Sequence, residues 1–212
     1  MQRHKRFTTK WPPGCFCAYN CGALKGNEYK SLSKTIAHAL RHEPSLYGIA
    51  LDKEGWADIN LLVEKLRKKY SRWEKIDIKD IHEMNQLSFK KRFEIKEDKI
   101  RALYGHSSEV NIIKQAVLPP QKLFHGTSAQ NAAIILEQGL QAMERQFVHL
   151  SADRKTAWNV GKRKADKPVI LIVNAAEAAG HGISFYYGSD TVWLADEIPP
   201  QFIIPEEKAH LP

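Results

Sequence analysis

The 212-residue chain has no long apolar run and only three cysteines. No segment approaches the roughly 20 apolar residues of a membrane-spanning helix, which argues against a transmembrane protein. The N-terminus, MQRHKRFTTKWPPG, is basic but lacks the apolar core of a signal peptide, so we expect a cytoplasmic protein. Cys15, Cys17 and Cys21 lie in one short stretch, and their odd number argues against a disulfide framework.

Two common nucleotide-binding motifs are also missing. The sequence has neither G-x-G-x-x-G after an expected strand nor G-x-x-x-x-G-K-[ST]. These absences argue against a Rossmann dinucleotide site and against a P-loop. If the protein binds a nucleotide, another architecture must hold it.

The charge is distributed unevenly along the chain. Lys and Arg number 32 against 24 Asp and Glu, a net charge of +8. Residues 1–118 carry 23 basic and 14 acidic side chains, whereas residues 119–212 carry 9 and 10. A basic first half suggests contact with a polyanion. A solvated basic face that serves solubility explains the charge equally well.

The first half shows the order of a winged-helix module. Apolar residues at helical spacing predict three helices, which begin near Ser31 and after Asp58 and Asp77. The first should end near Arg41, because a proline follows three residues later. FEIKEDKIRAL alternates apolar and polar residues around a polar turn and predicts a β-hairpin. Such modules bind nucleic acid in many proteins and serve protein interactions in others.

The second half predicts an α+β lobe. Strands are expected around residues 123–125, 147–150, 169–173, 185–186, 192–194 and 202–204. Ser128 and Asp153 are expected to cap two helices, the first ending at Gly139 and the second near Gly161. The segment KQAVLPPQK is the best candidate for a linker between the halves.

Two histidines stand at comparable places in the second half. His125 is expected to end a strand, and Gly126 and Thr127 then lead into a helix whose N–H groups suit an anionic or carbonyl ligand. His149 and Ser151 end the next expected strand. One such histidine is equally well explained as a structural residue, but two in one lobe favour a binding site.

The basic residues taken singly have a simple explanation. Arg41 and His42 stand at an expected helix C-terminus, where cations complement the helix dipole. Arg101 fits an ordinary residue of the hairpin, and Arg145 fits a surface arginine. None of these positions indicates chemistry by itself.

Five segments together resemble the RNA 2′-phosphotransferase family. SLSKTIAHALRHEPSLYGIALDKEGWADINLLVEKL resembles the N-terminal signature of that family, and IRALYGHS resembles its second motif. LFHGTS, RQFVHLS and TVWLADEIP resemble its C-terminal motifs, in the right order. The similarity runs from about residue 31 to about residue 204. LRHEP alone is a weak signal, whereas five segments at workable spacing are a strong one.

The resemblance implies an N-terminal winged-helix lobe and a C-terminal ADP-ribosyltransferase-like lobe. We assign residues 1–28 to an extension, 29–118 to the first lobe and 119–212 to the second. The implied catalytic tetrad is Arg41, His42, Arg101 and Arg145. The implied NAD⁺ pocket contains His125, Gly126, Thr127, His149, Ser151 and Val192. Val192 stands where many protein-modifying relatives have a glutamate.

The resemblance also implies a two-step reaction, without a membrane partner, on RNA that carries an internal 2′-phosphate. The 2′-phosphate attacks the anomeric carbon of the nicotinamide ribose of NAD⁺, and nicotinamide leaves. A hydroxyl of the same ADP-ribose then attacks phosphorus, giving 2′-hydroxyl RNA and ADP-ribose 1″,2″-cyclic phosphate. An anionic nucleophile needs no general base, which agrees with an apolar Val192. Spliced tRNA is the substrate of the family in some organisms.

Two features lie outside this pattern. Tyr104 stands where family members commonly have glutamine, which leaves the contacts near the hairpin open. Cys15, Cys17 and Cys21, with His4 or a distant fourth ligand, form a candidate structural zinc site, although their spacing differs from paired C-x₂-C motifs.

Two other functions stay open on the sequence. One is an RNA-binding module with a degenerate catalytic lobe, which would not consume NAD⁺. The other is an ADP-ribosyltransferase that modifies proteins or nucleic-acid ends and stops after the first step. Retention of all four tetrad positions counts against the first and favours the two-step reaction over the second.

Overall fold

The computed structural model describes residues 24, 26–88, 90–107 and 111–206, so the candidate zinc ligands His4, Cys15, Cys17 and Cys21 lie outside the described residues. The helices are α1 Gly26–Arg41, α2 Ile59–Lys69, α3 Ile78–Leu87, α4 Ala129–Gln138, α5 Arg154–Gly161 and α6 Ala175–Gly180. The strands are β1 Trp56–Asp58, β2 Phe93–Lys96, β3 Lys99–Ala102, β4 Leu123–Thr127, β5 Val148–Ser151, β6 Val169–Val173, β7 Phe185–Ser189, β8 Val192–Ala195 and β9 Ile203–Pro205. Short 3₁₀ helices span Ser45–Tyr47, Ser71–Trp73 and Pro200–Phe202.

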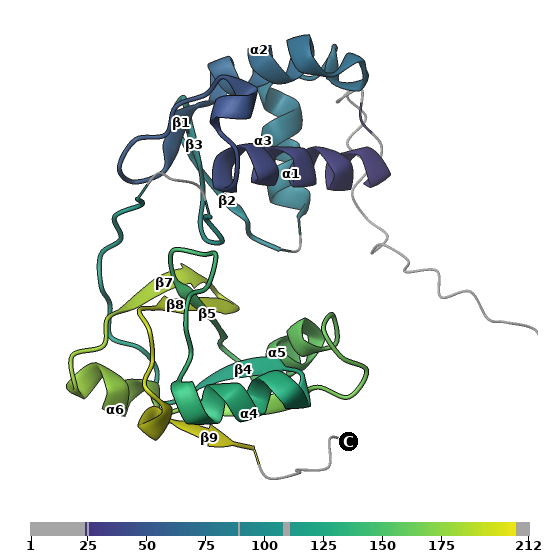
Figure 1. The fold of residues 1–212 in the computed structure, drawn as a ribbon. Coiled ribbons are helices and arrows are strands. Elements are labelled where there is room, and N and C mark those ends of the chain that lie inside the picture. Colours follow the sequence, from purple (N-terminus) through teal and green to yellow (C-terminus); the bar gives the residue numbers. More distant parts are fainter. Residues whose placement is uncertain (1–23, 25, 89, 108–110, 207–212) are drawn as a thin grey trace, which may run out of the picture.

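The elements form a mixed α/β structure with two antiparallel sheets and two hydrophobic cores. Helices α1 to α3 pack with the sheet β1-β3-β2 around residues such as Leu32 and Ile81. The second sheet has the order β7-β8-β5-β4-β6-β9, and its core includes Leu123 and Leu171. Full burial of one such side chain contributes roughly 1.5–3 kcal/mol. Figure 1 shows the first group of elements at the top and the second group below it.

The predicted helix starts are confirmed where capping residues marked them. The Asp58 carboxylate accepts a hydrogen bond of 2.9 Å from a first-turn N–H of α2. Asp77 and Asp80 form a capping box at α3. Ser128 and Asp153 cap α4 and α5 in the same way, at 3.2 and 2.8 Å. Each cap contributes about 1 kcal/mol. The residue before each helix therefore helps to determine where that helix begins.

Other boundaries differ from the expectation. Helix α1 begins at Gly26 rather than near Ser31, so residues 26–28 of the expected extension are helical. Strand β1 and helix α6 were not expected, because three and six residues are too short to show a periodic pattern. His125 lies in the middle of β4, since pairing with β6 continues through Thr127.

Hydrogen bonds join the two groups of elements. The backbone N–H of Gln146 donates to the His106 carbonyl at 3.1 Å. The side-chain amide of Gln146 bonds to both the N–H and the carbonyl of Ile112, at 3.0 and 2.6 Å. The Val117 N–H donates to the Phe185 carbonyl at 2.8 Å. These contacts hold the loop before β5 and the start of β7 against the segment that follows β3.

Candidate functional site

Arg41 presents a half-buried side chain at the C-terminal end of α1. Its Cζ atom lies 4.8 Å from the ring centroid of Tyr104. Its Nε and Nη2 atoms are buried, and no hydrogen-bond partner for them occurs among the described residues. Burial lowers the pKa of Arg41 to about 10; Tyr104 opposes this shift, whereas Arg92 and Arg145 add to it by like-charge repulsion. Tyr104 supports the charge, but two neighbouring arginines repel it and burial makes it costly, so this guanidinium suits an anionic ligand.

His42 follows Arg41 and is more exposed. Its Nδ1 atom lies 2.7 Å from the Ser107 hydroxyl oxygen, and its ring centroid lies 5.6 Å from that of His38. Burial lowers the pKa of His42, and His38, Arg41 and Arg145 lower it further. The imidazole is therefore neutral near pH 7 and is able to exchange a proton with a ligand hydroxyl.

Arg92 and Arg145 lie near Arg41. We call Arg41, His42, Arg92 and Arg145 together the cation cluster. Arg145 lies in the loop before β5, and Arg92 immediately precedes β2. Both are close enough to Arg41 to lower its pKa. The Arg92 Nη1 atom donates to the Ser33 hydroxyl at 3.3 Å. The sequence prediction did not name Arg92, because KKRF is typical of a solvated basic face. Its position next to Phe93, which is buried, was the feature that indicated a partly buried arginine.

Arg101 has different surroundings. Its Nε and Nη2 atoms contact one carboxylate oxygen of Glu94 at 2.8 and 2.6 Å. Its Nη1 atom lies 3.6 Å from the Glu54 carboxylate, and its Cζ atom lies 4.3 Å from the ring centroid of Trp56. These carboxylates offset the charge of Arg101 in this structure. Its predicted catalytic role stays a prediction.

His149 brings the second group of elements to the cation cluster. Its ring meets the Tyr104 ring edge-on, with centroids 6.3 Å apart. Burial, and then Arg145, lower the pKa of His149 to about 3, so the ring is neutral. Nδ1 lies 2.9 Å from the Phe147 carbonyl oxygen, which only accepts, so the proton is on Nδ1. Nε2 is buried and has no partner among the described residues, which leaves one acceptor available to a ligand.

The six residues predicted for NAD⁺ lie on three neighbouring strands. His125, Gly126 and Thr127 are in β4, His149 and Ser151 in β5, and Val192 in β8. Ser151 pairs directly with Val192 on one side and with Phe124 on the other. Paired residues share a face, so His149, Ser151 and Val192 point to one side of the sheet.

His125 and Thr127 alternate to the other face of β4, together with the core residue Leu123. The His125 Nδ1 atom lies 3.1 Å from the His149 carbonyl oxygen. Burial lowers the pKa of His125 despite this contact, which opposes the shift. The structure therefore brings His125 to the backbone of β5 and places its side chain on the face opposite Ser151.

Gly126 has a packing role that the sequence did not indicate. A Cβ atom at this position would overlap the carbonyl oxygen of Ala157 in α5 and would lie 3.1 Å from the Gly161 nitrogen. Helix α5 therefore packs backbone to backbone on β4. This contact explains the glycine without a ligand, and its part in binding NAD⁺ stays a prediction.

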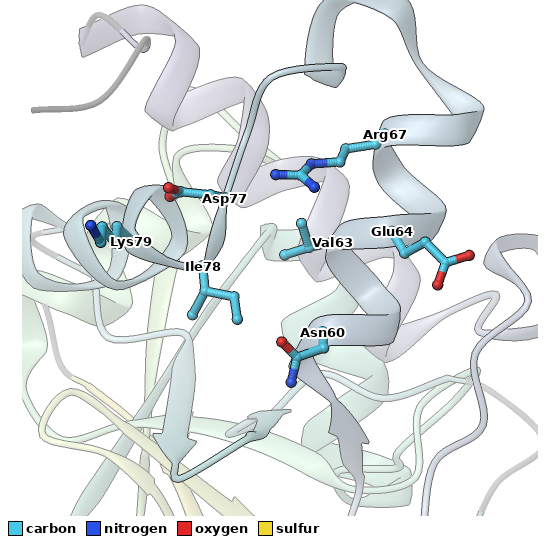
Figure 2. A pocket seen from close by; sticks show the side chains of 7 residues that line it. All are labelled: Asn60, Val63, Glu64, Arg67, Asp77, Ile78 and Lys79. Atoms are coloured by element: carbon cyan, nitrogen blue, oxygen red, sulfur yellow. The ribbon is translucent and has the colours of Figure 1, made fainter.

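A groove of about 330 Å³ lies away from the cation cluster, between α2 and α3 (Figure 2). It is lined by Asn60, Val63, Glu64, Arg67, Asp77, Ile78 and Lys79. The Arg67 Nε atom, on the wall of this groove, donates to the Ile76 carbonyl at 2.6 Å, so this N–H already has a partner. No residue predicted for catalysis or NAD⁺ binding lines this groove, so we assign it no part in the chemistry.

Two further findings concern the described residues only. They contain no group of three or more His, Cys, Asp or Glu side chains placed to hold a metal ion. Within the same ranges, none of the helices combines the length and the apolar character of a membrane span.

Comparisons with known proteins identify the family of this chain. Residues 27–197 match the model of the RNA 2′-phosphotransferase, Tpt1/KptA family. A probable RNA 2′-phosphotransferase of Acetivibrio thermocellus is 53% identical over 176 residues, covering 83% of this chain and 96% of the relative. Proteins of the same name from Bacillus thuringiensis and Flavobacterium johnsoniae are 47% and 42% identical; the matches cover 82% and 85% of this chain and 94% and 98% of those proteins. This chain therefore belongs to the RNA 2′-phosphotransferase family and is a transferase.

Proposed function

We propose that this protein transfers an internal 2′-phosphate of RNA to NAD⁺. The products are 2′-hydroxyl RNA, nicotinamide and ADP-ribose 1″,2″-cyclic phosphate. The observation that carries the proposal is the buried guanidinium of Arg41, whose Nε and Nη2 atoms have no partner among the described residues. Arg92, Arg145 and His42 surround it. Such a set of cationic donors suits a phosphate dianion.

In the first step, a 2′-phosphate oxygen bonds to the anomeric carbon of the nicotinamide ribose. The bond from that carbon to the pyridinium nitrogen breaks, and neutral nicotinamide leaves. The nucleophile is already an anion, so the step needs no general base. Val192 beside Ser151 fits this requirement, because the pair places no carboxylate there.

In the second step, the neighbouring ribose hydroxyl attacks phosphorus and the RNA 2′-oxygen leaves. The hydroxyl loses a proton and the leaving oxygen gains one. Among the residues of the cation cluster, only His42 exchanges a proton near neutral pH, because arginine stays protonated. The three arginines hold the same phosphate through both steps and offset its charge.

We assign NAD⁺ to the side of the sheet that carries His149, Ser151 and Val192. His149 offers a neutral ring with a free Nε2 acceptor, which suits a ribose hydroxyl or an amide. We further propose that the first group of elements is a winged-helix lobe that holds RNA, with β2 and β3 as the wing. The second group is then an ADP-ribosyltransferase-like lobe.

The test is incubation of the protein with NAD⁺ and an oligoribonucleotide that carries one internal 2′-phosphate, followed by mass analysis of all products. The expected result is 2′-hydroxyl RNA and a cyclic phosphate of ADP-ribose in equal amounts. The same oligonucleotide without the 2′-phosphate is the control and should leave NAD⁺ unconsumed. ADP-ribosylated RNA as the final product, or no consumption of NAD⁺, would refute the proposal.

A further inference from the structure

A groove of about 230 Å³ lies where the two groups of elements meet. Its lining residues are Lys91, Phe93, Glu94 and Leu103 from the first group and Tyr187, Ser189 and Asp190 from the second. Two of these residues are neighbours of the proposed site. Lys91 directly precedes Arg92, and Ser189 pairs with Val192 across the β7–β8 hairpin. The proposed chemistry uses none of the lining residues.

Tyr187 forms an exposed and firmly held aromatic wall of this groove. The residue is 49% exposed. Its hydroxyl donates a hydrogen bond of 2.6 Å to Asp190, and its ring meets Trp193 edge-on with centroids 5.9 Å apart. A ring that two contacts already hold loses little conformational entropy when a ligand stacks on it.

A β-bulge sets the direction of Tyr187. Tyr187 pairs with Trp193 and Ser189 pairs with Val192, so Gly188 is an extra residue in β7. A Cβ atom at Gly188 would lie 2.8 Å from the Val192 carbonyl oxygen, so this position has no room for a larger residue. Bulges of this kind re-aim side chains and occur often beside active sites.

The charged residues of the groove favour a nucleobase over a phosphate as its ligand. The carboxylates of Glu94 and Asp190 line it; Glu94 is paired with Arg101, whereas Asp190 accepts a bond from the neutral Tyr187 hydroxyl and would repel a phosphodiester. Carboxylates accept hydrogen bonds from the amino and ring N–H groups of nucleobases. Lys91 is exposed and supplies a cation for the RNA backbone.

From this arrangement we propose that the groove binds the base of a nucleotide adjacent to the one that carries the 2′-phosphate. Tyr187 stacks on the base, and Lys91 contacts the backbone phosphate between the two nucleotides. The proposal rests on the proposed function and makes single-stranded RNA around the modified ribose the recognised substrate. Because every base has a stacking face, the groove tolerates different bases. The adenine of NAD⁺ fits less well, since Phe93 and Leu103 belong to the group of elements that contributes no predicted NAD⁺ residue.

Steady-state kinetics of Tyr187→Ala and Tyr187→Phe test the stacking role. The substrate is an oligoribonucleotide with one internal 2′-phosphate, and its concentration and that of NAD⁺ are varied separately. Tyr187→Ala should raise KM for the RNA by roughly 5- to 150-fold, the range expected for loss of one base–aromatic stack. KM for NAD⁺ should not change, and Tyr187→Phe, which keeps the ring but loses the bond to Asp190, should raise KM for RNA much less than Tyr187→Ala does. Ile204→Ala is the matched control, because Ile204 is exposed in β9 at the opposite edge of the same sheet.

Oligonucleotides that lack the base on the 5′ or the 3′ side of the modified nucleotide identify the bound neighbour. The wild type should lose affinity for one of them, and Tyr187→Ala should not distinguish it from the intact RNA. An unchanged KM for RNA in Tyr187→Ala, or a rise in KM for NAD⁺ alone, overturns the proposal. If the wild type does not turn over this RNA, the proposed function fails. Direct binding of the labelled RNA then tests the groove on its own. Equal affinities of wild type and Tyr187→Ala for this RNA would refute the proposed base site.

Discussion

At the scale of single residues, His42 determines how a proton moves in the proposed reaction. Burial, His38 and Arg41 lower its pKa, which keeps the ring neutral. The first step transfers no proton and the second does, so His42→Ala should slow the second step by about 10²–10⁴. RNA that bears ADP-ribose on its 2′-phosphate should then accumulate in a time course with labelled substrate. Slow loss of substrate without this branched species would contradict the assignment.

Arg92 and Arg101 differ in their charged neighbours, so their loss should affect the reaction rate differently. Arg92 lies close to Arg41, whereas Arg101 is neutralised by Glu94 and Glu54. Removal of one preorganised donor to a reacting phosphate costs on the order of 10²–10³ in rate. We therefore expect that loss for Arg92→Ala in single-turnover measurements, and a smaller one for Arg101→Ala. The reverse order would support the sequence-based assignment of Arg101.

At the scale of elements, the contact of α5 with β4 depends on a missing side chain. Gly126→Ala forces a Cβ atom against the Ala157 carbonyl and should lower the free energy of unfolding by about 1–3 kcal/mol. Gly180→Ala in α6 is the matched control, because nothing lies within 4 Å of its added Cβ atom. Its stability should rise by up to about 1 kcal/mol or stay the same. Urea unfolding measures both. Unchanged stability of Gly126→Ala with a raised KM for NAD⁺ would assign Gly126 to ligand binding instead.

The elements that local chemistry marks were predictable from the sequence. Asp153 caps α5 as expected, and the apolar run Val169–Val173 is a strand with the expected bounds. β1 was missed because its existence depends on pairing with β3, where Trp56 lies opposite Arg101. A strand of three residues has no periodicity that reveals such a distant partner.

The candidate site was predictable only in part, for the same reason. LRH at a helix end and HLS in a strand carry family motifs, so Arg41 and His149 were named. Both side chains contact the Tyr104 ring, and this proximity arises from the tertiary fold and not from any spacing in the sequence. Arg92 and Arg101 are both arginines near a hairpin, and only the carboxylates around Arg101 distinguish them.

At the scale of the whole molecule, two buried histidines couple stability to pH. Burial is the main cause that lowers the pKa of His106 to about 4 and that of His149 to about 3. In the unfolded chain each binds a proton near pH 6.5, so between these values the unfolded state holds more protons. Stability should therefore be full above about pH 6.5 and fall as the pH drops toward 4. Urea unfolding from pH 7.5 to 5 measures the slope, and His149→Gln should reduce it. An equal slope in wild type and variant would contradict this account.

Gln146 has a consequence for how this chain is able to vary during evolution. Its amide binds the Ile112 backbone and, at 2.6 Å, the side-chain oxygen of Asn111, so one side chain joins both halves next to Arg145. Neither hydrophobic core depends on that side chain. A substitution at Gln146 would therefore leave both cores intact and remove one link next to Arg145, while the backbone bonds from Gln146 to His106 and from Val117 to Phe185 remain. Positions 111 and 146 are expected to change together among descendants of this sequence, whereas each core is free to drift independently of the other.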